Sequence, residues 1–110
     1  MADLSVSELL TDMLGAAKTS LGKDYSKAKD FAKPELQRLA KSLVDIAKLV
    51  AMKKVNQQQA RALLAIHRNT TQTVLLTIEG LGIIAVENAL NAAFDVIRTT
   101  VNSAVKFALI

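Results

Sequence analysis

The chain has 110 residues, of which 51% are hydrophobic and 4% aromatic, with four glycines, one proline and no cysteine. The lack of cysteine excludes a disulfide framework and any thiolate metal site, and the few glycines and prolines favour helices over a turn-rich β fold. The net charge of +4 permits binding to an anionic surface without requiring it. We therefore expect one all-α domain over residues 1–110.

A first helix is expected over residues 5–21. Ser5 and Glu8 have the spacing of a capping box, in which each side chain binds a backbone N–H left free at the helix start. Gly22 suits the left-handed residue that ends many helices. The apolar residues recur at helical spacing and share one face. They are Val6, Leu9, Leu10, Met13, Leu14, Ala17 and Leu21.

A second helix is expected over residues 34–55, because Pro34 is favoured in a first helical turn and disfavours helix in the residue before it. The lysine-rich stretch 23–33 is then either a short helix or an ordered connection. The second helix has the apolar seam of a bundle or a coiled coil on one face only. The seam residues are Leu36, Leu39, Ala40, Leu43, Ile46, Ala47 and Val50.

A third helix is expected over residues 57–70, with Asn56 as its N-cap. The residues from Asn69 to Thr73 form a cluster of weak helix formers. The phase of the polar positions shifts across this cluster, so the sequence predicts a bend there.

The C-terminal region 73–109 is predicted to be one long helix that is apolar around most of its circumference. Its polar residues fall on one line, which continues past Gly80 and Gly82 and so favours a kinked helix over two separate helices. A break at these glycines is the alternative. We call this line the polar stripe. It consists of Thr77, Gly80, Glu87, Asn88, Asn91, Asp95, Arg98, Asn102 and Lys106.

Such a helix predicts self-association, because a helix that is apolar nearly all round must be buried nearly all round. The two preceding helices cover only one side of it. We therefore expect a helical bundle that is completed by oligomerisation. The predicted interface residues are Leu81, Ile83, Val86, Leu90, Phe94, Ile97 and Val101.

Membrane contact is an alternative use of the apolar region. Glu79, Glu87 and Asp95 disfavour a span, because carboxylates are costly inside a bilayer. Lying on a lipid surface is less costly, since the polar stripe can face water. Glu79 lies outside the polar stripe and is either a buried or interface-paired carboxylate or, as we favour, a partly exposed one at a bend.

The sequence predicts no catalytic, cofactor-binding or metal-binding constellation. His67 is the only histidine and has no second ligand at a usual spacing. A basic region over residues 33–68 is the candidate site for an anionic ligand or lipid. Nucleic acid is disfavoured, because no aromatic residues alternate with the basic ones. The candidate anion-binding residues are Arg38, Lys41, Lys48, Arg61 and Arg68.

The sequence therefore predicts a non-catalytic, oligomerising helical scaffold, adaptor or assembly subunit, whose partner is itself or another protein. One alternative is an amphipathic protein that binds a lipid or other apolar surface or an apolar ligand. Another is a protein that binds an anionic ligand or nucleic acid through the basic region. The N-terminal residues lack the basic and apolar segments of a signal peptide, so a cytoplasmic location is expected.

Overall fold

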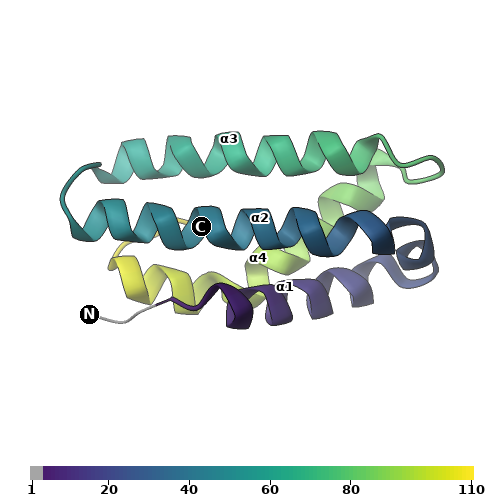
Figure 1. The fold of residues 1–110 in the computed structure, drawn as a ribbon, viewed down its shortest axis with the longest axis horizontal. Coiled ribbons are helices and arrows are strands. Elements are labelled where there is room, and N and C mark those ends of the chain that lie inside the picture. Colours follow the sequence, from purple (N-terminus) through teal and green to yellow (C-terminus); the bar gives the residue numbers. More distant parts are fainter. Residues whose placement is uncertain (1–3) are drawn as a thin grey trace.

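The computed structural model describes residues 4–110, which form an all-α bundle (Figure 1). In Figure 1, α2 and α3 run alongside each other, α1 lies below them, and α4 crosses obliquely behind. Helix α1 packs most extensively against α4, and α2 packs against both α1 and α3. The predicted all-α fold is confirmed. The elements of residues 4–110 are α1 (Val6–Leu21), the 3-10 turn η1 (Gly22–Asp24), α2 (Tyr25–Ala51), α3 (Gln57–Leu76) and α4 (Ile83–Val105).

The predicted N-caps are present at α1 and α3, but only one of the two capping-box bonds predicted for Ser5 and Glu8 is formed. Ser5 Oγ accepts a hydrogen bond from the backbone N–H of Glu8 at 3.3 Å, and Gly22 ends α1 with a φ of 55°. Asn56 and Gln59 form both bonds of a capping box, at 2.8 and 2.9 Å. Local side-chain chemistry is therefore sufficient to determine these helix ends.

The helix boundary predicted at Pro34 is wrong, because α2 is continuous through this proline. Proline inside a helix removes a backbone hydrogen bond and costs about 3 kcal/mol or more. Burial of one continuous apolar face offsets this penalty. The helix also ends at Ala51 rather than at residue 55. The buried residues of this face lie on both sides of the proline. They are Ala28, Ala32, Leu36, Leu39, Ala40 and Leu43.

The bend predicted over residues 69–73 is also wrong, because α3 continues through this cluster. Thr70 Oγ1 donates a hydrogen bond to the carbonyl of Ile66 at 3.0 Å, and Thr73 Oγ1 donates to the carbonyl of Asn69 at 2.8 Å. These bonds satisfy the threonine hydroxyls within the helix. Packing against α2 then outweighs the weak helix propensity of the cluster.

The single helix predicted over residues 73–109 is wrong, and the alternative break at the glycines is what the structure shows. Helix α3 ends at Leu76 and α4 begins at Ile83. Between them, Gly80 has a φ of 83°, outside the α-helical region, and the side chains of Ile78 and Leu81 are buried in the core. The chain therefore reverses here, and α4 returns along the bundle (Figure 1).

The reversal explains how the inward apolar side of α4 is covered by the chain's own helices, while Ile83, Ile84 and Val96 remain exposed. Its inward residues lie in one hydrophobic core with residues of α1, α2 and α3. The polar stripe residues of α4 are exposed, except for Asn102, which is partly buried. None of the helices within residues 4–110 offers an apolar, charge-poor run long enough to cross a bilayer.

Replacing Gly80 with alanine should lower the free energy of unfolding by about 1–2 kcal/mol, because a side chain at this φ is strained. A Cβ there would also lie 3.3 Å from Lys27 Nζ, which donates a hydrogen bond to the Gly80 carbonyl. Urea denaturation followed by far-UV circular dichroism measures the change. Gly82→Ala is the matched control, because Gly82 has a φ of −82° and a Cβ there would meet no atom within 4 Å. It should change the free energy of unfolding by less than about 0.5 kcal/mol. Equal losses of stability in the two variants would contradict this account of Gly80.

Candidate functional site

The predicted interface residues lie mostly in the core of the chain itself. Ile83 is exposed, with 54% of its surface accessible. The other six are already enclosed by the chain's own helices, and they offer no surface to a second copy. Ile83 is therefore the one predicted interface residue that the single chain leaves exposed. The six enclosed residues are Leu81, Val86, Leu90, Phe94, Ile97 and Val101.

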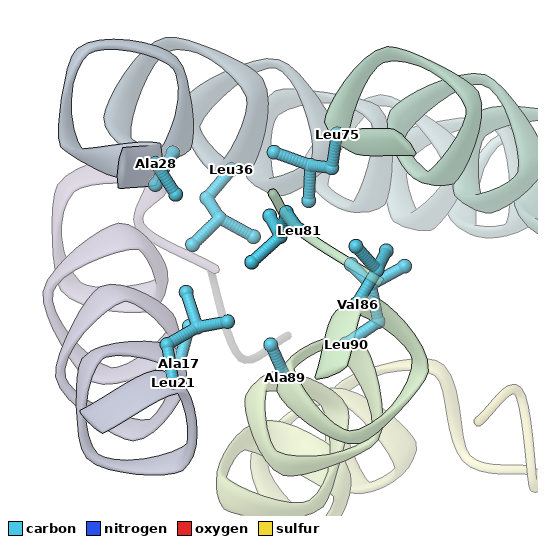
Figure 2. A pocket seen from close by; sticks show the side chains of 10 residues that line it. Ala17, Leu21, Ala28, Leu36, Leu75, Leu81, Val86, Ala89 and Leu90 are labelled. Atoms are coloured by element: carbon cyan, nitrogen blue, oxygen red, sulfur yellow. The ribbon is translucent and has the colours of Figure 1, made fainter. Parts of the chain in front are cut away.

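An internal cavity lies where the helices meet near the turn between α3 and α4 (Figure 2). Its volume is about 10 Å³, close to the smallest space that holds one water molecule. A water there would find no side-chain hydrogen-bond partner, so the space is a dry packing gap rather than a ligand site. The lining side chains are all apolar: Ala17, Leu21, Ala28, Ala32, Leu36, Leu75, Leu81, Val86, Ala89 and Leu90.

The structure divides the predicted anion-binding residues into two groups. Arg61 and Arg68 lie on α3 and line the same surface cleft. Arg38, Lys41 and Lys48 lie on α2, and none of them lines this cleft. The five residues lie close together in the sequence, but the fold places only two of them at this cleft.

The cleft lies between α3, α4 and residues 107–110 and has a volume of about 300 Å³. We call it the arginine cleft, because Arg61, Arg68 and Arg98 line it. Arg98 is not one of the predicted anion-binding residues, because it lies outside residues 33–68, in the polar stripe of α4. The other lining residues are Leu64, Ala65, Asn91, Phe94, Leu109 and Ile110.

Arg68 is held in the arginine cleft by two contacts. Its Nη2 donates a hydrogen bond to Asn91 Oδ1 at 2.6 Å. Its guanidinium carbon lies 5.0 Å from the centre of the Phe94 ring, a cation–π distance. These contacts orient the guanidinium and leave its positive charge in place.

Arg61 is held in a similar way at the C-terminal segment. Its Nε donates a hydrogen bond to the carbonyl of Ala108 at 2.9 Å, and its guanidinium carbon lies 5.4 Å from the centre of the Phe107 ring. An arginine on an aromatic ring remains charged and keeps further N–H donors available.

The arginine cleft has an excess of positive charge. In the described part of the chain, the ion pairs include neither Arg61 nor Arg68. Arg98 Nη1 lies 2.7 Å from Asp95 Oδ1, and both side chains are about half exposed, so this pair is weak. By contrast, Arg38 on α2 pairs with the buried Glu35 at 3.1 Å. The cleft therefore combines unneutralised guanidinium groups with apolar side chains.

Asn102 fixes the C-terminal wall of the cleft. The chain leaves α4 at Lys106, which has a left-handed φ of 67°. The backbone N–H groups of Leu109 and Ile110 then both donate to Asn102 Oδ1 at 3.0 Å, and Asn102 Nδ2 donates to the Ile110 carbonyl at 3.3 Å. Leu109 is buried, so hydrogen bonds and apolar packing both hold this segment.

A second hollow lies on the outer surface between α1 and α4, with a volume of about 570 Å³. We call it the α1–α4 groove. Its side chains are small and Asp12 is the one charged residue among them, while Val96 is half exposed at its side. The lining residues are Thr11, Asp12, Gly15, Ala16, Thr19, Ser20, Ala92 and Val96.

Other candidate features carry little chemistry. Glu79 is exposed in the turn between α3 and α4, in agreement with the favoured interpretation, and His67 is partly exposed on α3. No three histidine, cysteine or carboxylate side chains of residues 4–110 are grouped so that they could hold a metal ion.

Comparison of the chain with protein-family models, with curated proteins and with solved structures found no match.

Replacing Asn102 with alanine should release residues 109 and 110 from α4, because it removes all three hydrogen bonds that the side chain makes to them. The free energy of unfolding should fall by about 1–2 kcal/mol. Amide hydrogen exchange measured by NMR should show faster exchange at Leu109 and Ile110. Asn88→Ala, at an exposed position of the same helix, is the control. Unchanged exchange at both amides in the Asn102 variant would contradict the assigned clamp.

Proposed function

We propose that the protein is a non-catalytic helical scaffold or adaptor that self-associates through the α1–α4 groove. The observation that carries this proposal is Gly15. Glycine inside a helix is destabilising by about 0.5–1 kcal/mol relative to alanine. A Cβ at Gly15 would meet nothing within 4 Å, so no contact within the single chain requires glycine at this position. A second helix packed in the groove would require it, because glycine permits close approach of another backbone.

The shape of the face around Gly15 supports a second copy as the partner. A twofold interface uses the same patch on both subunits, so that patch must carry both a projection and a recess. Val96 lines the groove with half of its surface exposed, and the small residues Gly15 and Ala16 line it as well. Two copies related by a twofold axis would each bring an exposed valine and a glycine to the same contact.

The energetics of the face also favour burial. Covering the exposed part of Val96 contributes about 25 cal/mol for each Å² of apolar surface removed from water. The groove contains one charged residue, Asp12, so little charge must be desolvated. A second copy on this face leaves the basic side of α2 and α3 exposed for another partner, as an adaptor requires.

Replacing Gly15 with arginine should convert the dimer into a monomer, because the long side chain occupies the groove. The single chain should tolerate the change, since nothing lies within 4 Å of the new Cβ. Size-exclusion chromatography with light scattering should give twice the chain mass for the wild type and one chain mass for the variant. Ala62→Arg is the matched control at an exposed position of α3, and it should leave the mass unchanged.

Two outcomes would overturn the proposal. One is a wild-type chain that remains monomeric at millimolar concentration. The other is a Gly15→Arg variant that keeps the wild-type mass. Far-UV circular dichroism of each variant separates the loss of association from the loss of fold.

A further inference from the structure

We propose that residues 107–110, which we call the strap, are an internal ligand in a peptide-binding site, and that an apolar segment of another protein occupies this site by displacing the strap. The site consists of Asn102 on α4, Arg61 on α3 and the apolar position that Leu109 fills at the wall of the arginine cleft. None of these three residues lines the α1–α4 groove, so the site is separate from the proposed self-association.

The hydrogen bonds of the site are made to the backbone of the strap. Asn102 Oδ1 accepts hydrogen bonds from the N–H groups of Leu109 and Ile110 at 3.0 Å, and Asn102 Nδ2 donates to the Ile110 carbonyl at 3.3 Å. Arg61 Nε donates to the Ala108 carbonyl at 2.9 Å. Every residue other than proline carries these backbone groups, so another peptide can make the same four bonds.

Two side chains of the strap define the kind of segment that fits. Leu109 is buried and lines the cleft together with Leu64. The centre of the Phe107 ring lies 5.4 Å from the guanidinium carbon of Arg61. The Leu109 N–H also donates to the Phe107 carbonyl at 3.0 Å, so the strap turns at the exposed Ala108. The site therefore fits a tight turn in which an aromatic residue, any exposed residue and a buried aliphatic residue follow one another.

The link between α4 and the strap favours exchange. Lys106 has a left-handed φ of 67°, a conformation that strains a residue with a Cβ. Lys106 can relax when the strap leaves, whereas a separate peptide carries no such strain. The strain therefore offsets part of the advantage that the covalent link gives to the strap.

The length of the strap favours another protein over a second copy as the source of the segment. Four residues span at most about 14 Å, so the strap of a second copy reaches the site only where the ends of two α4 helices nearly touch. The α1–α4 groove meets α4 at Ala92 and Val96, in the middle of the helix, and not at this end.

NMR titration of the isotope-labelled full chain with an acetylated and amidated peptide of residues 106–110 tests the proposal. The peptide should bind the Leu109→Ser chain at least about tenfold more tightly than the wild type, because the shortened side chain no longer anchors the chain's own strap. The same peptide carrying L109D should bind at least about tenfold more weakly, since its carboxylate would be buried without a partner. No binding to the Leu109→Ser chain, or equal binding of the two peptides, would overturn the proposal.

Lys106→Gly tests the exchange in a chain that should not lose stability. Glycine adopts this φ without strain, so the chain's own strap should be held more firmly and the peptide should bind about fivefold more weakly than to the wild type. Lys53→Gly is the matched control, because Lys53 also has a left-handed φ, of 58°, but lies between α2 and α3. Equal peptide binding by these two variants would overturn the proposed competition between strap and peptide.

Asn102→Ala locates the site when it is added to the Leu109→Ser chain. It should weaken peptide binding by about tenfold, because three backbone hydrogen bonds are lost. Asn88→Ala, at an exposed position of the same helix, should change the affinity by less than about twofold. Equal binding by the two double variants would place the peptide elsewhere and overturn the assigned site.

Two further measurements complete the test. Far-UV circular dichroism checks that each variant remains folded. Titrations of the wild type are repeated at increasing protein concentration, where the affinity for the peptide should stay constant. An affinity that falls as the protein concentration rises would show that straps of second copies compete for the site, and would overturn another protein as the source of the segment.

Discussion

The packing of α4 against α1 is the interaction on which the rest of the structure depends. Helix α4 supplies the largest fully buried side chain of the described residues, Phe94, and it also supplies Leu90 and Ile97. They reach α1 because the chain reverses in the turn between α3 and α4, where Gly80 has a positive φ. Without this reversal, the apolar side of α4 would have no cover within the chain.

The oblique path of α4 also creates both surface features. Because α4 packs extensively along α1, the two helices form a shallow groove of small side chains. Because α4 makes much less contact with α3, a cleft remains between them, partly closed by the segment that Asn102 holds. The two candidate binding surfaces therefore lie on different sides of one helix, where one does not block the other.

Sequence reasoning succeeded where the cause of a structure is local, and it failed where the cause is distant. The caps at Ser5, Gly22 and Asn56 depend on atoms a few residues away, so their patterns were sufficient. Pro34 and the polar cluster over residues 69–73 were interpreted as breaks because their intrinsic propensities are poor. Packing of the helices that contain them against other helices outweighs these propensities, and such contacts do not appear in a local pattern.

The sequence by itself determined the all-α class and the first helix, because these follow from periodicity and local hydrogen bonding. Only the tertiary structure decided what covers the apolar surface of the last helix. A hydrophobic pattern states that a face must be buried, but it does not distinguish the chain's own helices from those of a second copy. Likewise, Arg61, Arg68 and Arg98 come together only because the reversal at Gly80 places α4 beside α3.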